Sequence, residues 1–120
     1  MKLAIELDKL VTESSLPTNL KPNVSKFQRI VEIVNSDNKF AKDLVMSIKS
    51  KLFGKKHPKT QLLILELVEF TTVKCGRPLH ILYNNKAFLK IINTIFNQRN
   101  LNPQIKNKAL FLIQFWNFHF

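Results

Sequence analysis

The sequence has 120 residues, of which 45% are hydrophobic, and this length suits one domain with its own core. No segment reaches the roughly 18 to 20 uninterrupted apolar residues of a membrane-spanning helix, and acidic residues inside the opening MKLAIELDKLV argue against a signal peptide. A single cysteine, Cys75, excludes an internal disulfide. The formal net charge of +11 favours an anionic partner: a phosphoinositide or other acidic lipid surface, an acidic peptide or a nucleic acid.

The first half of the chain predicts three helices before a central one. The first is expected over residues 2–13, and Asn23, after the loop LPTNLKP, is a suitable N-cap for the second. The break NSDN precedes the third, which Gly54 ends. The apolar residues at helical spacing in these segments are Leu3, Leu7, Leu10, Val11, Phe27, Ile30, Val31, Val34, Phe40, Leu44, Ile48 and Leu52.

The stretch KTQLLILELVEFTTVKCG, residues 59–76, is apolar nearly all round and predicts a central helix enclosed by other helices. Pro58 is a good residue for the first turn, and Gly76 is expected to end the helix in a left-handed turn. Glu66 and Glu69 are predicted to be solvated charges on the single exposed edge. That stripe of roughly 80° contains Lys59, Leu62, Glu66, Glu69 and Val73.

Three further helices are expected after the central one. The dipeptide Arg77-Pro78 opens a short helix to about Tyr83, and helices over 86–97 and 104–118 follow. The total is seven helices with no convincing strand. Short connections between successive helices indicate an all-α fold, an antiparallel right-handed superhelix.

Catalysis and metal binding have little support in the sequence. Cys75 and His80 lie five residues apart, but no acidic residue follows Glu69 to orient the histidine. Cys75 is expected to be a small core residue, and His80 to bond a backbone group at the start of the following helix. A zinc site would need His57 and His119 as well, and their spacing does not support one. Neither a catalytic residue, a metal nor a cofactor is therefore expected.

Positive charge concentrates in two regions. All acidic residues lie at or before Glu69, so the last fifty residues carry only basic charge. The segment KSKLFGKKHPK forms the second concentration, and it is a candidate for contact with an acidic membrane or another acidic ligand. The alternative is a solvated basic surface with no dedicated ligand. The candidate residues are Lys49, Lys51, Lys55, Lys56 and Lys59.

Several segments together resemble the VHS domain, within the wider ENTH-like superfamily. They are DKLVTESSLP, PNVSKFQRIVEIVNS, AKDLVMSIKSKL, HPKTQLLILELVEFTTVKCGRPLH, FLKIINTIF and IKNKALFLIQFW. The resemblance implies one VHS-like domain over 1–120, a superhelix of about seven helices that stops before the family's final helix. It also implies a non-enzymatic adaptor that sorts protein cargo in the cytoplasm, peripheral to endosomal or Golgi membranes.

The resemblance also assigns candidate binding residues. Ubiquitin-binding members carry a Trp and a Leu where this chain has Val24 and Gln28, and Leu63 of the central helix is a further candidate. Val24 buries far less area than a Trp, which predicts weak ubiquitin binding at most. The alternative is that Val24 and Leu63 are partly buried packing residues. Members that bind acidic dileucine sorting signals use positions matching Lys86 and Lys90. Arg77 completes the sorting-signal candidates, since an acidic peptide favours positive charge.

Two alternative functions stay open. A related superhelix, the CTD-interacting type, binds phosphorylated peptides from the tail of RNA polymerase. Nonspecific nucleic-acid binding suits the charge, but most phenylalanines fall on core faces and leave no base-stacking surface.

The ending LIQFWNFHF is rich in aromatic residues. Trp116 is expected to pack inward, whereas Phe118 and Phe120 are candidates for self-association or for packing under a further helix.

Overall fold

Seven α-helices and no strand make up the part of the chain that the computed structural model describes, residues 2–52, 57–98 and 101–119. They are α1 (Lys2–Ser14), α2 (Val24–Ser36), α3 (Lys39–Leu52), α4 (Pro58–Lys74), α5 (Arg77–Tyr83), α6 (Lys86–Phe96) and α7 (Pro103–His119). The predicted all-α fold of seven helices is confirmed, with every helix boundary within two residues of its expected place. Gly54, the expected end of the third helix, lies outside the described residues.

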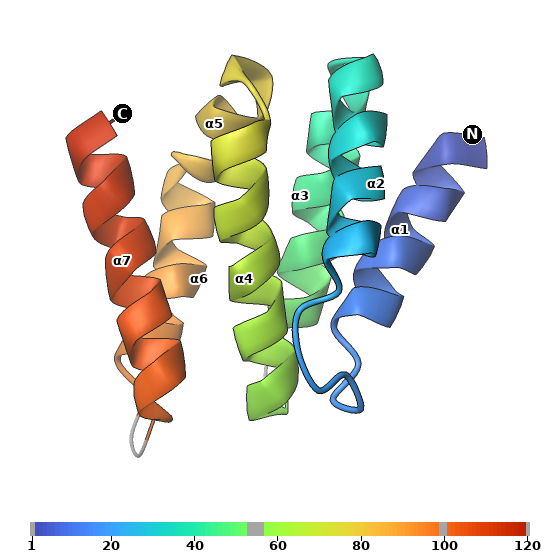
Figure 1. Ribbon diagram of the computed structural model, residues 1–120. Coiled ribbons are helices and arrows are strands. Elements are labelled where there is room, and N and C mark those ends of the chain that lie inside the picture. Colours follow the sequence, from blue (N-terminus) through green and yellow to red (C-terminus); the bar gives the residue numbers. More distant parts are fainter. Residues whose placement is uncertain (1, 53–56, 99–100, 120) are drawn as a thin grey trace.

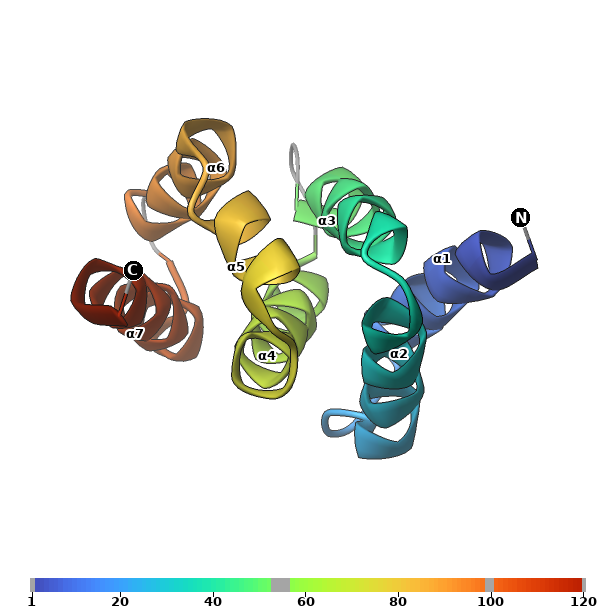
Figure 2. The same cartoon turned by 90° about the horizontal axis from the view of Figure 1, so that it is seen from above.

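The helices form a superhelix of two layers (Figures 1 and 2). The front layer in Figure 1 contains α2, α4 and α7, which run in the same direction and begin at the lower end of the molecule. The rear layer contains α1, α3, α5 and α6, and α1, α3 and α6 run the opposite way and finish at that lower end. The starts of three helices and the ends of three others therefore meet on one surface.

Asparagine and histidine side chains cap the starts of three helices. The Asn23 side chain accepts a hydrogen bond of 3.1 Å from the backbone N–H of Lys26, which confirms the predicted N-cap of α2. Asn85 does the same for α6, where its side-chain oxygen accepts from Ala87. For α4, the cap is His57, whose Nδ1 accepts from the N–H of Lys59 at 3.1 Å.

The prediction that Gly76 ends α4 in a left-handed turn is wrong. Gly76 has φ −96° and ψ −163°, an extended conformation with φ in the range open to every residue. Helix α4 ends because Cys75 turns extended, at φ −104° and ψ 163°. The carbonyl oxygen of Gly76 accepts hydrogen bonds from Leu79 and His80, so this residue begins α5 instead of ending α4.

Helix α4 is the centre of the fold, with neighbours on both sides. Most of its apolar residues are fully buried, and the predicted exposed edge is its least buried face, with Val73 66% exposed at the upper end. Phe70 packs against Phe27 of α2 at a ring distance of 5.6 Å. On the other side, Trp116 is buried as predicted and packs against Tyr83 and Phe88.

Ion pairs fasten α1 to α2 at the surface. Nε of Arg29 donates to Oε2 of Glu6 at 2.8 Å, and Nη2 of Arg29 donates to Oε1 at 3.2 Å. This hydrogen bonding lowers the pKa of Glu6 and raises the pKa of Arg29. Lys26 pairs with Glu13 nearer the lower end, at 3.1 Å.

Candidate interaction surfaces

Cys75 and His80, at the junction of α4 and α5, are the residues that a nucleophilic site would need, but both are held in non-reactive positions. Cys75 is only 6% exposed, and burial raises the pKa of its thiol to about 11. Nε2 of His80 lies 2.7 Å from the carbonyl oxygen of Thr72. His80 thus bonds a backbone group, as expected, but one in the preceding helix α4, which corrects the prediction of a partner in the following helix.

Tyr83 is another buried ionisable residue near this point. Its hydroxyl lies 2.8 Å from Oγ1 of Thr71, and burial raises the pKa of Tyr83. Among the described residues, no group of three His, Cys, Asp or Glu side chains is placed to hold a metal ion. Likewise, none of the described helices is long and apolar enough to cross a membrane.

The predicted ubiquitin-binding residues do not lie on one surface. Val24 is 59% exposed at the start of α2, and Gln28, one turn later, is also exposed. Leu63, by contrast, is only 2% exposed, because the flank of α4 that carries it is covered. Leu63 is therefore a packing residue in this fold. Of the candidate ubiquitin-binding residues, only Val24 and Gln28 on α2 are accessible.

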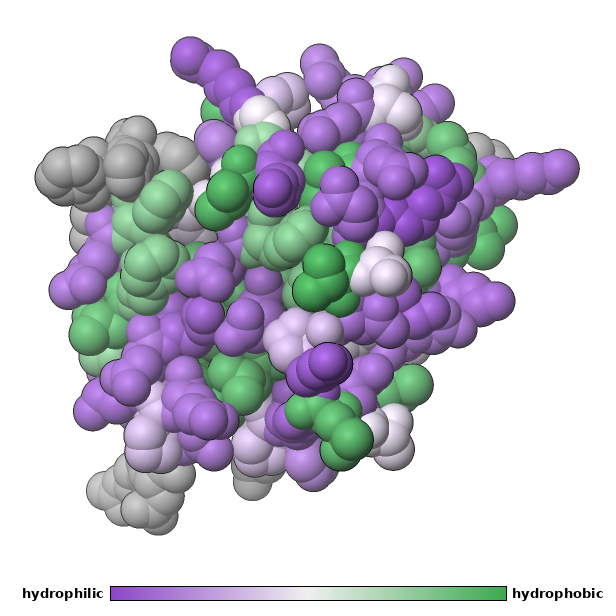
Figure 3. Space-filling model, viewed as in Figure 1, coloured by the Kyte–Doolittle hydropathy of each residue, from purple (hydrophilic) through white to green (hydrophobic). Residues whose placement is uncertain are grey.

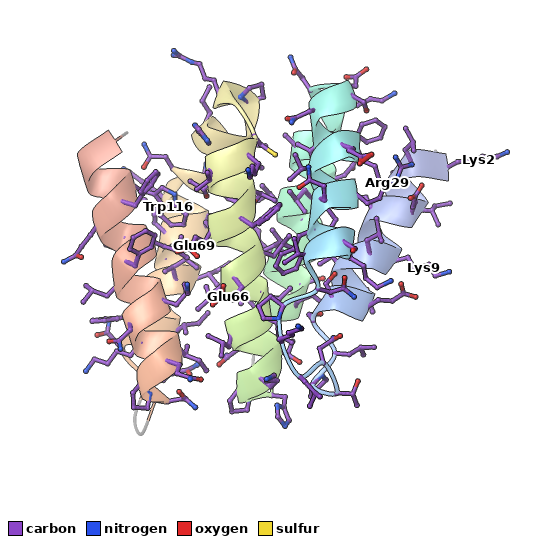
Figure 4. The ribbon with its side chains drawn as sticks, in the orientation of Figure 1. Lys2, Lys9, Arg29, Glu66, Glu69 and Trp116 are labelled. Atoms are coloured by element: carbon purple, nitrogen blue, oxygen red, sulfur yellow. The ribbon has the colours of Figure 1, made fainter. Side chains whose placement is uncertain are left out.

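Glu66 and Glu69 of α4 face α7 rather than open solvent (Figure 4). Nζ of Lys108 on α7 lies 3.2 Å from Oε1 of Glu66 and 3.0 Å from Oε1 of Glu69. The prediction that both glutamates are solvated edge charges is therefore wrong, since each is less than a third exposed and ion-paired. We call these three residues the α4–α7 clasp. Burial alone would lower the pKa of Lys108, but its bonds to Glu69 and Glu66 outweigh burial and raise it.

A hollow of about 440 Å³ lies over the clasp between α4 and α7. Its other lining residues include Leu62 and Phe111, and Phe111 is 47% exposed. On this front face, Figure 3 shows hydrophobic residues in separate patches divided by polar ones. Lys108 is the one basic residue against two glutamates in this lining, so the clasp leaves the hollow slightly acidic and unsuited to an acidic ligand.

A second hollow, of about 690 Å³, lies along α6. Lys86 and Lys90 both line it, one turn apart on the same helix face, with Leu89 between them. Its remaining lining is polar and carries no acid: Asn93, Thr94, Asn97 and Gln98. Arg77 is exposed at the start of α5 but does not line the hollow. The fold thus brings two of the three sorting-signal candidates together and leaves the third outside.

Several of the helix ends that lie at the lower end of the molecule in Figure 1 carry lysines. Lys49 and Lys51 lie in the last turn of α3, and Lys59 lies in the first turn of α4. Lys55 and Lys56, the other predicted members, lie outside the described residues. Sequence reasoning missed three further lysines that the loop before α2, the start of α2 and the start of α7 bring to the same end. Within the described residues, we call this set the lysine-rich end: Lys21, Lys26, Lys49, Lys51, Lys59 and Lys106.

Of the predicted self-association residues, Phe120 and the side chain of Phe118 lie outside what the structure describes. The exposed aromatic surface that is described on α7 belongs instead to Phe111, which packs 6.1 Å from Phe115. Helical spacing alone could have indicated this pair, because residues four apart share a helix face.

Comparison with known proteins gives a consistent family match. A family model described as the VHS domain matches residues 1–120. The chain is 32% identical over 89 residues to TOM1-like protein 2 of Homo sapiens, covering 72% of the chain and 18% of that protein. It is 34% identical over 87 residues to TOM1-like protein 9 of Arabidopsis thaliana, covering 72% and 13%. The class E vacuolar protein-sorting machinery protein HSE1 of Coccidioides immitis (strain RS) is 30% identical over 87 residues, covering 72% and 14%. The chain thus spans less than a fifth of each of these relatives.

Proposed function

The chain belongs to the VHS domain family, and we propose that it is a non-enzymatic adaptor module for protein cargo in endosomal or trans-Golgi vesicle sorting. One relative is named as part of the class E vacuolar protein-sorting machinery, which supports a role in sorting. The site chemistry agrees, because Cys75 is buried with a raised pKa and His80 lies against a backbone carbonyl. Binding surfaces, rather than reacting groups, are what the described residues offer.

The observation that carries this proposal is the hollow along α6. All of its lining residues belong to α6 or to the two positions just after it, so it is a shallow, open groove along one helix. Lys86 and Lys90 supply positive charge, and Leu89 supplies an apolar floor. An extended acidic peptide that carries an apolar residue fits this combination, because its carboxylates can pair with the lysines while the apolar side chain contacts Leu89.

Titration with an acidic peptide that contains two leucines tests the proposal. We expect NMR signals of α6 to shift, and Lys86→Ala and Lys90→Ala each to weaken binding about fivefold. Lys42→Ala is the matched control, since Lys42 is an exposed lysine of α3 outside the hollow, and it should bind as the wild type does. Unchanged binding by the Lys86→Ala/Lys90→Ala double variant would contradict the proposal. A doubly phosphorylated polymerase-tail peptide that bound more tightly would favour the CTD-interacting alternative.

Ubiquitin is a second candidate ligand, supported by the exposed position of Val24 and Gln28 on one face of α2. Because Val24 offers little area and Leu63 is buried, we expect weak binding. Val24→Trp should strengthen ubiquitin binding by about tenfold, since a Trp buries on the order of 200 Å² at an interface. An NMR titration in which ubiquitin shifts signals elsewhere than α2, or in which Val24→Trp has no effect, would exclude this face.

An acidic lipid surface is a third candidate, and the lysine-rich end supports it. Glu13 is the one acidic residue within a turn of this end in the described chain, and Lys26 pairs with it. The other lysines of the end are exposed or half-buried, and within the described residues none of them is ion-paired with a carboxylate. Each lysine near an anionic membrane surface contributes about 1 kcal/mol of attraction. A peripheral contact of this kind would hold the adaptor at the membrane from which cargo is sorted.

A further inference from the structure

The segment between α1 and α2 displays apolar side chains at the lysine-rich end. Leu16 is 45% exposed and Leu20 is 94% exposed, and Val24 at the start of α2 is 59% exposed. Leu20 is the most exposed large hydrophobic residue of the described chain. A leucine side chain gains free energy when it leaves water, in proportion to the apolar area that is buried. The fold does not gain this free energy from Leu20, so a partner that covers the side chain would gain it on binding.

Hydrogen bonds hold this segment in a defined shape. Nδ2 of Asn19 donates to the carbonyl oxygens of Glu13 and Leu16, at 2.9 Å each. The backbone N–H of Asn19 donates to Leu16 as well, at 3.1 Å. On the far side, Nζ of Lys59 donates to the carbonyl oxygen of Leu20 at 3.3 Å. Leu20 is thus displayed by a fixed loop, and little conformational entropy remains to be lost when it binds.

Positive charge surrounds the exposed leucine. Lys21 directly follows Leu20 in the sequence, and the ammonium group of Lys59 is bonded to the carbonyl oxygen of Leu20. Glu13, in the last turn of α1 just before the loop, is already ion-paired with Lys26 at 3.1 Å. The loop therefore presents an apolar side chain, Leu20, flanked by Lys21 and Lys59. We call these three residues the tip, and its positive charge is complementary to an anionic surface.

We propose that this tip inserts into an acidic bilayer, with Leu20 among the acyl chains and Lys21 and Lys59 at the phosphate groups. The inference rests on the membrane contact suggested above for the lysine-rich end and adds an inserted residue to it. A bilayer offers both chemistries together, because anionic head groups lie only about 5–10 Å above the apolar boundary that an interfacial side chain reaches. Lysine side chains suit that depth, since their stems pack on apolar groups while their ammonium groups stay at the surface.

Vesicle sedimentation tests the insertion directly. The probes are phosphatidylcholine vesicles with and without about one-third phosphatidylserine, which sets a negative surface potential. We expect binding to the anionic vesicles only, about tenfold weaker for Leu20→Ser because apolar burial is lost. Lys21→Ala and Lys59→Ala should each weaken binding about fivefold, in a salt-dependent manner. The matched controls, Ile81→Ser and Lys42→Ala, exchange an exposed apolar residue and an exposed lysine elsewhere and should bind as the wild type does.

Tryptophan fluorescence of Leu20→Trp provides a second readout. The native Trp116 is 2% exposed and supplies a constant background, so a blue shift on anionic vesicles reports insertion at position 20. If the lysine variants lose binding while Leu20→Ser does not, and Leu20→Trp shows no shift, insertion is refuted and the electrostatic contact stands. If the wild type does not bind anionic vesicles, both the insertion and the lipid contact are refuted.

Discussion

Two buried serines, Ser14 and Ser47, differ in their hydrogen bonding. Within the described chain, the hydroxyl of Ser14 is buried with no partner, whereas Oγ of Ser47 donates to Oδ1 of Asp8 at 2.7 Å. A buried polar group without a partner costs about 1–3 kcal/mol. We therefore expect Ser14→Ala to raise the free energy of unfolding by about 0.5–1 kcal/mol, and Ser47→Ala to lower it by about 1 kcal/mol. Urea unfolding of both variants checks the opposite signs, and equal effects would contradict this assignment.

The buried thiol gives a prediction about reactivity. Because burial raises the pKa of Cys75 to about 11, roughly one thousandth of the thiol is ionised at pH 8. We expect a disulfide reagent such as dithionitrobenzoate to react with Cys75 far more slowly in the folded protein than in urea. Reaction at the same rate in both conditions would show that the thiol is exposed.

Single residues were the least predictable level. Asn23 is a usual capping residue and was predicted, but His57 is not, so its cap on α4 was missed. The charge partner of Glu66 and Glu69 lies 39 residues beyond Glu69, and only packing of α7 on α4 reveals it. Burial of Leu63 likewise depends on a neighbouring element rather than on its own helix.

At the level of elements, the junction of α4 and α5 makes a sharp prediction for Gly76. A Cβ added there would meet only Cδ of Pro78, at 3.9 Å, an ordinary contact. Since the backbone is extended, Gly76→Ala should change stability by no more than about 0.5 kcal/mol, or raise it slightly by restricting the unfolded chain. Thermal unfolding measures this. A loss above about 1 kcal/mol would indicate the left-handed turn that the sequence first suggested.

The α4–α7 clasp predicts a pH-dependent link between two helices. Lys108→Ala leaves two half-buried glutamates three residues apart, and we expect a loss of about 1–2 kcal/mol at neutral pH. Lys42→Ala should cost almost nothing. Because the pKa of Lys108 is raised on folding, the stabilisation is complete below its ordinary value of 10.5 and is lost as the pH rises beyond it. The variant and the wild type should therefore converge in stability at strongly alkaline pH, and a constant difference would contradict the clasp.

Elements were the most predictable level, because helical spacing of apolar residues leaves few alternatives. The 3.6-residue pattern located all seven helices, and the nearly uniform apolar surface of α4 identified it as the central one. What ends each helix was harder to infer, since a glycine can start the next helix as well as close the last, as Gly76 does.

For the whole molecule, the net charge of +11 predicts that salt stabilises the fold. Like charges crowd the lysine-rich end, and screening should reduce their repulsion more than it weakens the few exposed ion pairs. We expect the melting temperature to rise between low salt and about 0.5 M sodium chloride. Lys49→Gln/Lys51→Gln should show a smaller rise, because it removes part of the repulsion. A melting temperature that falls with salt would mean that the ion pairs dominate.

The lysine-rich end could be predicted only in part. Lys49, Lys51 and Lys59 are close in the sequence, so their grouping was visible. Lys21, Lys26 and Lys106 come from distant segments and join them because the helices alternate in direction. The exposed Leu20 lies on the same surface for the same reason, and the sequence of its loop alone gives no indication of a binding function.

The start of α1 and the end of α7 lie on the side of the molecule opposite to that surface. Helix α1 starts at the upper end and α7 finishes there (Figure 1). A molecule seated on a bilayer by its lower end would therefore direct the start of α1 and the end of α7 outward, about the length of a helix away from the lipid. Any polypeptide joined to either terminus would leave into open solvent, where it could reach other partners without passing beneath the domain.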